Sequence, residues 1–303
     1  YWAPMRFPGR KDGQMIDDVR SQSDTSDMER CYFERDGLRL AYVDSAPDQT
    51  DRPAVLMIHG FPDTADLWAH QVRDLQAQGF RVIAPDTRGH GASDLAARAG
   101  DYHWSEVVAD LLGLLDHLGL DQVDVVGHDW GAAFAWLLAG RHPARVRRLV
   151  VISVGHPTAY ARSGLRQKLR SWYILYFLLA GIAEWTLRLP FFPGFRAVFT
   201  SHPDPGEVKA RMAAPGRWRA ALRVYRANVL SVLLGRHPKV RAPTLGIYSR
   251  GDAHLVERQM VRSDQWVHGR FRYVPVDGGH WVPMTHADVI SRLIIEHLTS
   301  SQP

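Results

Sequence analysis

The sequence contains only one cysteine, Cys31, among 303 residues. A single cysteine cannot form a disulfide within the chain, so the composition gives no indication of an oxidising compartment. The sequence also has no uninterrupted apolar run of about 18 residues, the length that a transmembrane helix needs. The longest candidate, residues 172–183, is too short and is followed by Glu184. We therefore expect a cytoplasmic protein of ordinary globular composition.

Patterns that bind metals or nucleotides are also missing from the sequence. No group of histidine, carboxylate and cysteine residues has the spacing of metal ligands. Neither a phosphate-binding loop nor a dinucleotide-binding fingerprint occurs. We therefore expect the protein to need no metal and no other cofactor.

Acidic residues are scarce in one part of the chain. Residues 157–240 contain 14 lysines and arginines but only three acidic residues, whereas the remainder carries a net negative charge. A basic segment can attract nucleic acid or an anionic surface, but no nucleic-acid motif accompanies it. The simplest interpretation is a solvated, arginine-rich helical face. Association of this basic and apolar segment with a membrane surface is the alternative.

Strand-like and helix-like segments alternate along most of the chain. Asp36-Gly37 separates two short strands in a predicted hairpin. Six further apolar segments have the length and composition of buried strands. These are residues 54–59, 81–85, 122–127, 146–154, 243–249 and 271–276. Apolar residues with helical spacing mark residues 65–77, 104–119, 130–142 and 288–298. The alternation predicts a mainly parallel sheet with helices on both faces.

The alternation is interrupted once. Residues 157–240 are helical and aromatic, with proline-rich turns at 189–194 and 201–207. We therefore predict one core formed by residues 30–156 and 241–303, into which residues 157–240 are inserted as a helical cap. The polar stretch over residues 1–29 has no periodicity that could bury a face, so we expect it to be poorly ordered.

The strongest chemical signal is the pentapeptide Gly127-His128-Asp129-Trp130-Gly131. It lies between a predicted strand and a predicted helix, which is the context of a nucleophile elbow. The flanking glycines permit a crowded backbone, and the free N–H groups of the following helix favour negative charge. Asp129 occupies the central position, where serine is usual. The alternative is that Asp129 only caps the helix.

An aspartate at this position changes the chemistry that the site supports. A carboxylate is ionised near neutral pH, so Asp129 can attack an sp³ carbon without a base. The product is an alkyl ester on the protein, which activated water must then cleave at the Asp129 carboxyl carbon. This chemistry favours epoxides and alkyl halides over routine ester hydrolysis.

Four segments resemble motifs of the α/β-hydrolase superfamily and, within it, of the epoxide hydrolases. They are His59-Gly60-Phe61-Pro62, residues 86–94 (DTRGHGASD), residues 127–132 (GHDWGA) and Gly278-Gly279-His280-Trp281, in the family's order. The resemblance covers about residues 31–298. It implies an eight-stranded, mainly parallel sheet flanked by helices, with an inserted helical cap.

The resemblance also implies the partners of Asp129, because triads of this superfamily run nucleophile, acid, histidine. His280 follows the last predicted strand and would activate water. Asp252 follows the preceding strand and would orient His280, with Asp264 as its main competitor. The backbone N–H groups of Phe61 and Trp130 are implied to form the oxyanion hole.

Epoxide opening leaves an alkoxide and therefore needs an acid, so the cap should distinguish epoxides from halides. Residues 171–185 resemble the epoxide hydrolase cap, with Tyr173 at the position of the first ring-opening tyrosine, although residues 178–180 depart from the pattern. Tyr225 matches the second tyrosine. A phenol with a pKa of about 10 stays protonated at neutral pH and can donate to the epoxide oxygen. Tyr176 is the alternative to Tyr173.

The sequence thus predicts a cofactor-independent epoxide hydrolase that acts on a small apolar epoxide and water, without a nucleic-acid partner. The residues expected around its apolar pocket are His59, Pro62, Trp130, His156, Tyr176 and Trp281. Oligomeric state stays open, with a homodimer allowed. One alternative is a haloalkane or haloacid dehalogenase that uses the same triad. The other is a noncatalytic ligand-binding protein on the same fold.

Overall fold

The computed structural model describes residues 28–189, 199 and 201–300. The predicted lead-in over residues 1–29 therefore lies, up to residue 27, outside the described residues. The same holds for most of the proline-rich turn predicted at 189–194. Within the described residues, no helix is long and apolar enough to cross a membrane.

An eight-stranded sheet forms the centre of the fold, with the strand order β1-β2-β4-β3-β5-β6-β7-β8. The pairs β1–β2 and β2–β4 are antiparallel, and every other neighbouring pair is parallel. This arrangement confirms the predicted sheet. The strands are β1 (Cys31–Arg35), β2 (Leu38–Asp44), β3 (Ala54–Ile58), β4 (Arg81–Pro85), β5 (Val123–His128), β6 (Val146–Ile152), β7 (Thr244–Ser249) and β8 (Phe271–Val276).

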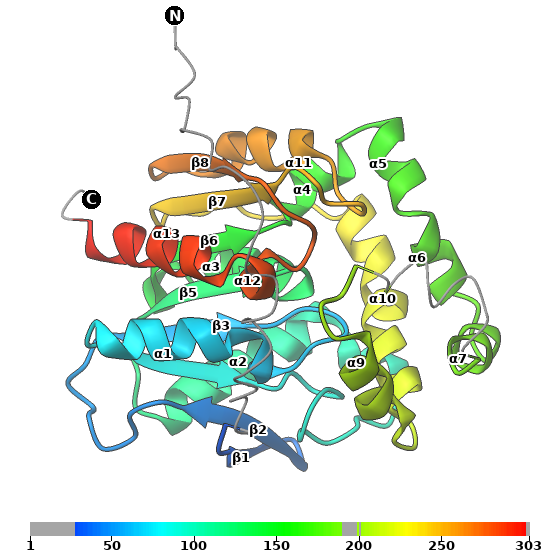
Figure 1. The fold of residues 1–303 in the computed structure, drawn as a ribbon, viewed down its shortest axis with the longest axis horizontal. Helices are drawn as coiled ribbons and strands as arrows, with labels where there is room; N and C mark the ends of the chain where they lie inside the picture. Colours follow the sequence, from blue (N-terminus) through cyan, green and yellow to red (C-terminus); the bar gives the residue numbers. More distant parts are fainter. Residues whose placement is uncertain (1–27, 190–198, 200, 301–303) are drawn as a thin grey trace, which may run out of the picture.

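Helices cover both faces of the sheet (Figure 1). Helices α1 and α13 pack on one face and α2 and α3 on the other, so two separate apolar clusters form. Because strands expose successive side chains to opposite faces, Leu56 of β3 joins one cluster and Val55 the other. The core helices are α1 (Ala69–Ala77), α2 (Trp104–His117), α3 (Trp130–Arg141), α11 (Glu257–Val261), α12 (Val282–Thr285) and α13 (Ala287–Thr299). Short 3₁₀ helices are η1 (Ala65–Trp68), η2 (Ala99–Tyr102), η3 (Pro143–Arg145) and η4 (Arg262–Trp266).

A helical insert separates β6 from β7, as expected of a cap, and gathers at one end of the sheet (right in Figure 1). Its longest described helix, α10, packs against η2 of the core and against the other cap helices α4, α6, α7 and α9. These contacts join the insert to the core. The boundaries at residues 157 and 240 stay a prediction. The described cap helices are α4 (Pro157–Ala161), α5 (Leu165–Arg170), α6 (Trp172–Phe177), α7 (Ile182–Leu187), α9 (Pro205–Ala213) and α10 (Arg217–Leu234).

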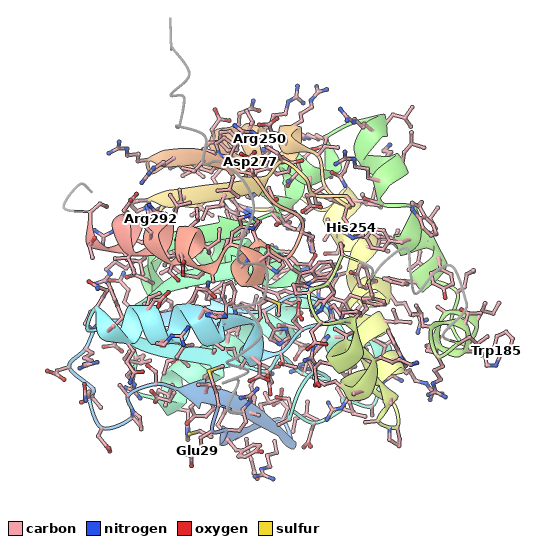
Figure 2. All side chains as sticks on the ribbon, in the orientation of Figure 1. Glu29, Trp185, Arg250, His254, Asp277 and Arg292 are labelled. Carbon is pink, nitrogen blue, oxygen red and sulfur yellow. The ribbon has the colours of Figure 1, made fainter. Side chains whose placement is uncertain are left out.

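The loops that follow β7 and β8 meet at one edge of the sheet. There Arg250 and Asp277 form an exposed ion pair of 2.9 Å (Figure 2). The hydroxyl of Ser249, at the end of β7, also donates to the Gly278 carbonyl. These contacts tie together the two loops whose residues carry Asp252 and His280.

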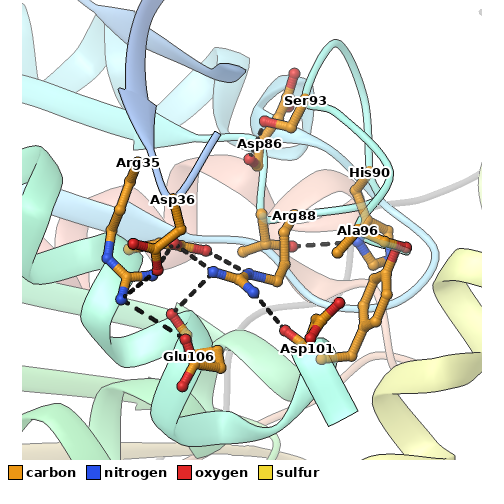
Figure 3. A network of polar contacts seen from close by, with 12 residues as sticks. Arg35, Asp36, Asp86, Arg88, His90, Ser93, Ala96, Asp101 and Glu106 are labelled. Atoms are coloured by element: carbon orange, nitrogen blue, oxygen red, sulfur yellow. Dashed lines mark hydrogen bonds and ion pairs between the residues drawn. The ribbon is translucent and has the colours of Figure 1, made fainter. Parts of the chain in front are cut away.

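A buried ion pair fixes the loop after β4, which contains the predicted motif at residues 86–94. The Arg88 guanidinium donates twice to the Asp110 carboxylate of α2, each time over 2.6 Å. It also donates to the Asp101 carbonyl over 2.5 Å, and the Arg35 guanidinium of β1 donates to Asp110 Oδ1 over 2.9 Å. Figure 3 shows Arg35, Arg88 and Asp101 in this network. These contacts hold Arg88 of the motif against α2 in the core.

Candidate functional site

Asp129 lies in the tight turn between β5 and α3. Its φ is 53°, in the left-handed region that residues other than glycine rarely adopt. The turn is too crowded for a side chain at either flanking position, so both flanking residues must be glycine. A Cβ at Gly127 would lie 2.4 Å from the Gly131 carbonyl oxygen, and a Cβ at Gly131 would lie 2.0 Å from that of Ile58. The crowded turn leaves the Asp129 side chain in the wall of a cavity between core and cap.

Asp129, His280 and Asp252 come together because they follow β5, β8 and β7, whose carboxyl ends meet at one edge of the sheet. His280 Nδ1 lies 2.8 Å from Asp252 Oδ2, and His280 Nε2 lies 3.5 Å from Asp129 Oδ2. Asp252 Oδ1 accepts the backbone N–H groups of His254 and Leu255 over 2.8 and 3.1 Å. The Asp252 carboxylate therefore has fixed partners on both oxygens. The competing Asp264 is exposed on η4.

The charges of this group shift one another's pKa values. Burial lowers the pKa of His280, but Asp252 and Asp129 on either side outweigh it and raise this pKa to about 10. Burial raises the pKa of each aspartate, but the His280 imidazole brings both pKa values below the ordinary range. At neutral pH the site therefore holds an imidazolium between two carboxylates.

The two oxygens of the Asp129 carboxylate have different partners. Oδ1 accepts the backbone N–H of Phe61 over 2.9 Å, and Oδ2 faces His280. A backbone donor at this position is suited to hold negative charge on oxygen. Trp130 is the first residue of α3, and the contribution of its backbone N–H stays a prediction.

A cavity of about 400 Å³ lies between Asp129 and the cap. Tyr173 of α6 and Tyr225 of α10 line it together with Asp129, and both phenols are buried. Burial raises the pKa of each phenol well above its ordinary value, so both hydroxyls are protonated at neutral pH. The remaining wall is largely aliphatic and aromatic. It includes Trp130, Ala133, Val154, Pro157, Tyr160, Ile174, Leu175, Val229, Val232, Leu233 and Leu255.

Comparison with known proteins identifies the family of this chain. The sequence profile described as "alpha/beta hydrolase fold" matches residues 53–287. Epoxide hydrolase 4 of Mus musculus is 30% identical over 283 residues, which cover 87% of this chain and 78% of that protein. The chain belongs to the epoxide hydrolase family of α/β hydrolases.

Bacterial members of the family are also similar to this chain. Epoxide hydrolase A of Mycobacterium tuberculosis (strain H37Rv) is 29% identical over 311 residues, covering 87% of this chain and 95% of that protein. The crystal structure of epoxide hydrolase A from Mycobacterium thermoresistibile superposes with a TM-score of 0.75 and 26% identity. That match covers 89% of this chain and 98% of the other. The family fold therefore extends over the core and the cap alike.

Of the six residues predicted around the pocket, Trp130 lines the cavity and the other five do not. His59 instead connects two loops, because its Nδ1 contacts the Gly60 carbonyl and its Nε2 accepts the N–H of Thr87. Pro62 borders a separate hollow. His156 Nε2 bonds the Pro238 carbonyl at 3.1 Å. Each of these side chains has tertiary contacts that the sequence does not reveal, and its role at the pocket stays a prediction.

Tyr176 and Trp281 also point elsewhere. The Tyr176 hydroxyl bonds the Thr186 hydroxyl of α7, so this tyrosine packs between cap helices. The Trp281 indole donates over 2.9 Å to Asp63, which also contacts His202 of the cap at 3.0 Å. Trp281 thus helps to join cap and core, directly after His280 in the chain.

Three polar residues near the site were missed by the sequence analysis. Tyr160 and Gln167 line the cavity and both bond the Ser171 hydroxyl, at 2.8 and 2.9 Å. The His254 ring packs edge-on against His280, with centroids 5.3 Å apart. Its position two residues after Asp252 was the only available signal.

Within the described residues, no group of three or more His, Cys, Asp or Glu side chains could hold a metal ion.

Proposed function

We propose that this chain hydrolyses an apolar epoxide to a vicinal diol through a covalent ester on Asp129. The observation that carries the proposal is the presence of one carboxylate and two buried phenols in the wall of one apolar cavity. The lowered pKa of Asp129 and the raised pKa of each phenol favour the ionised carboxylate and the protonated phenols at neutral pH. Opening an epoxide needs a nucleophile at carbon and an acid at oxygen at the same time. Asp129 supplies the first, and Tyr173 and Tyr225 supply the second.

In the first step, Asp129 attacks one epoxide carbon and the bond from that carbon to the ring oxygen breaks. The departing oxygen takes a proton from Tyr173 or Tyr225, which becomes a phenolate. The imidazolium of His280 returns a proton to this phenolate through solvent, so His280 becomes neutral. This transfer is favoured because esterification removes the Asp129 charge, one of the two charges that raise the pKa of His280.

In the second step, neutral His280 takes a proton from water as the water oxygen bonds to the Asp129 carboxyl carbon. The Phe61 N–H, 2.9 Å from Asp129 Oδ1, would hold the negative oxygen that forms, together with the N–H of Trp130. The ester bond then breaks, and the departing diol oxygen takes the proton from His280. The new carboxylic acid returns its proton to His280, which restores the starting state.

The cap favours an epoxide over a halide as substrate. A halide leaves as an anion and needs only a polar contact, such as the indole N–H of Trp130. Two buried phenols beside Asp129 would have no task in that reaction, whereas they meet the need of an epoxide oxygen for a proton. A noncatalytic binding protein would have no use for the Asp129–His280–Asp252 arrangement.

The proposal is tested by measuring diol formation from aryl and alkyl epoxides, with halide release from haloalkanes alongside. We expect Asp129→Ala to abolish diol formation. The Tyr173→Phe/Tyr225→Phe double variant should slow it by about 10²-fold or more, the usual contribution of general acid catalysis. Tyr176→Phe is the matched control, because its hydroxyl bonds Thr186 outside the cavity wall, and should retain activity.

Two outcomes would contradict the proposal. Diol formation by Asp129→Ala at the wild-type rate would exclude a covalent role for Asp129. Halide release that depends on Asp129 but not on Tyr173 and Tyr225, without diol formation, would assign the chain to dehalogenation instead.

A further inference from the structure

Large apolar side chains project into solvent from the outer side of the cap. Those on α5 to α7 that are 51–70% exposed include Leu165, Leu169, Trp172, Leu175, Ile182 and Trp185. Figure 2 shows Trp185 extending from α7 away from the rest of the molecule. Scattered exposed apolar residues are normal, but a group on consecutive helices marks an interaction site. We call this surface the apolar cap face.

Helical geometry explains why the exposed side chains of a given helix lie on one face of that helix. Leu165 and Leu169 are four residues apart on α5, and Trp172 and Leu175 are three apart on α6, which are the spacings of one helix face. Tyr173 and Phe177 of α6 occupy the opposite face and are buried. Helix α10 adds exposed leucines at 230 and 234 (67% and 79%). The cap thus has apolar side chains that are buried within the fold and a second set of apolar side chains that are exposed to solvent.

The charges on this part of the cap have one sign. Arg162, Arg166, Lys168 and Arg188 are exposed. The only acidic residue within residues 157–189 is Glu184, which is buried and bound to the Arg226 guanidinium. Helix α10 contains no acidic residue. On α4 to α7 and α10, basic side chains therefore accompany the exposed apolar residues, and no exposed acidic side chain does.

The cavity of the proposed active site reaches this surface. Lys168, Leu175 and Leu233 line the cavity and are exposed to solvent, with Leu175 at 70% and Leu233 at 44%. The wall of the cavity is therefore continuous with the apolar cap face. A molecule that enters the cavity by this route passes over leucine side chains and beside Lys168.

We propose that the apolar cap face docks on the surface of an anionic lipid bilayer, so that the cavity opens toward the lipid. Leucine and tryptophan side chains enter the boundary between headgroups and acyl chains, and flanking arginines and lysines attract anionic headgroups. A second copy of this chain fits the face less well, because two basic surfaces would meet. The further consequence, that the substrate is an epoxide dissolved in the bilayer, rests on the proposed hydrolase activity.

The docking is tested by co-sedimentation of the full chain with phosphatidylcholine vesicles that contain or lack phosphatidylglycerol. We expect binding to the anionic vesicles that weakens with added salt. Replacement of Arg162, Arg166 and Arg188 by glutamine should weaken the partition coefficient roughly 100-fold, since each basic residue near the surface adds to the attraction. The matched control replaces Arg73, Arg272 and Arg292 by glutamine. It removes the same charge from exposed positions on α1, β8 and α13 of the core and should leave binding within about twofold.

A third variant removes apolar contacts without changing charge. Leu165→Gln/Leu169→Gln/Trp185→Gln should reduce binding by at least as much as the cap arginine variant, because buried apolar area drives insertion. Circular dichroism of each variant checks that it is folded. Three results would overturn the docking proposal: no binding of wild type to anionic vesicles at low salt, equal losses in the cap and control arginine variants, or a wild-type dimer that the third variant converts to a monomer.

The substrate consequence has its own measurement. A lipophilic epoxide is supplied within anionic vesicles, and a water-soluble epoxide is supplied in buffer. The cap arginine variant should hydrolyse the soluble epoxide at the wild-type rate and the vesicle-bound epoxide at least tenfold more slowly. If the cap arginine variant hydrolysed both epoxides at the wild-type rate, delivery of the substrate from the bilayer would be overturned. If wild type hydrolysed neither epoxide, the proposed hydrolase activity would be refuted instead. The vesicle-binding experiment would still test the docking proposal independently.

Discussion

The Nδ1 atom of His280 lies 2.8 Å from Oδ2 of Asp252, and both side chains are buried. Because backbone N–H groups fill the other oxygen of Asp252, this carboxylate cannot turn away from the imidazole without losing them. The imidazole is therefore held with Nε2 toward Asp129. In the proposed reaction, this contact fixes the orientation of the imidazole that activates water and stabilises the imidazolium that forms.

Asp252→Asn tests that contact. The amide keeps the shape of the side chain but cannot stabilise the imidazolium, so ester hydrolysis should slow by about 10³–10⁴-fold. Attack by Asp129 needs no base and should persist, so the alkyl-protein ester should accumulate and appear in the intact mass of the protein. Asp264→Asn, on an exposed residue of η4, is the control and should show no accumulation. Rapid turnover by Asp252→Asn would contradict the assignment.

The two chemical steps should differ in their dependence on pH. Asp129 has a lowered pKa, so it is ionised across neutral pH and the first step should be flat between about pH 6 and 9. Formation of the ester neutralises Asp129, so the pKa of His280 falls from about 10. Because the base must be neutral, ester hydrolysis is lost as pH falls through this lowered pKa. Single-turnover kinetics should therefore show an acid limb in the second step alone. The same limb in both steps would contradict this.

Arg88→Met tests the buried ion pair that fixes the loop after β4. The exposed fractions of the Arg88 and Asp110 side chains are 3% and 8%, so the variant leaves a buried carboxylate with only Arg35 as its charged partner. We expect the free energy of unfolding in urea to fall by about 3 kcal/mol. Arg250→Met, which breaks the exposed pair with Asp277, should leave it unchanged within error. Equal losses of unfolding free energy in the two variants would show that burial does not determine how much each ion pair stabilises the fold.

Trp281→Phe tests the junction between cap and core. The variant removes the indole donor to Asp63. The pKa of Asp63, which burial raises, is brought to about 2 by His202 and other partners, so this carboxylate is charged. An unmet buried acceptor costs about 1–3 kcal/mol, and amide hydrogen exchange in α9 should become faster. Trp136→Phe, which removes an indole bond to the Val154 carbonyl within the core, should leave α9 exchange unchanged relative to the rest of the chain.

The sheet and the residues at its edge could be predicted from the sequence for a physical reason. Parallel strands bring their carboxyl ends to one edge, so residues that follow β5, β7 and β8 must lie near one another. The pentapeptide motif pointed to Asp129, and the resemblance to α/β hydrolases pointed to Asp252 and His280. The strand rule explains why these three side chains lie within hydrogen-bond or ion-pair distance of one another. The distances agree with the predicted roles, and those roles remain to be tested by experiment.

Residues in the cap and loops could not be predicted in the same way. Tyr173 and Tyr176 lie on the same short helix, yet only Tyr173 lines the cavity, because the hydroxyl of Tyr176 bonds Thr186 of the next helix. His254 reaches His280 through a turn after Asp252 that no periodicity describes. Contacts between separate helices decide these positions, and short motifs do not specify such contacts.

The central claim, that Asp129 forms an ester which water cleaves at its carboxyl carbon, has one direct measurement. Protein in excess over a reactive epoxide is allowed a single turnover in water enriched in heavy oxygen, and the peptide that contains Asp129 is then analysed by mass spectrometry. The proposed mechanism predicts heavy oxygen in the Asp129 carboxylate and none in the diol, whose new oxygen comes from the protein. Heavy oxygen in the diol with an unlabelled Asp129 would mean that water attacks the epoxide directly, and would contradict the account.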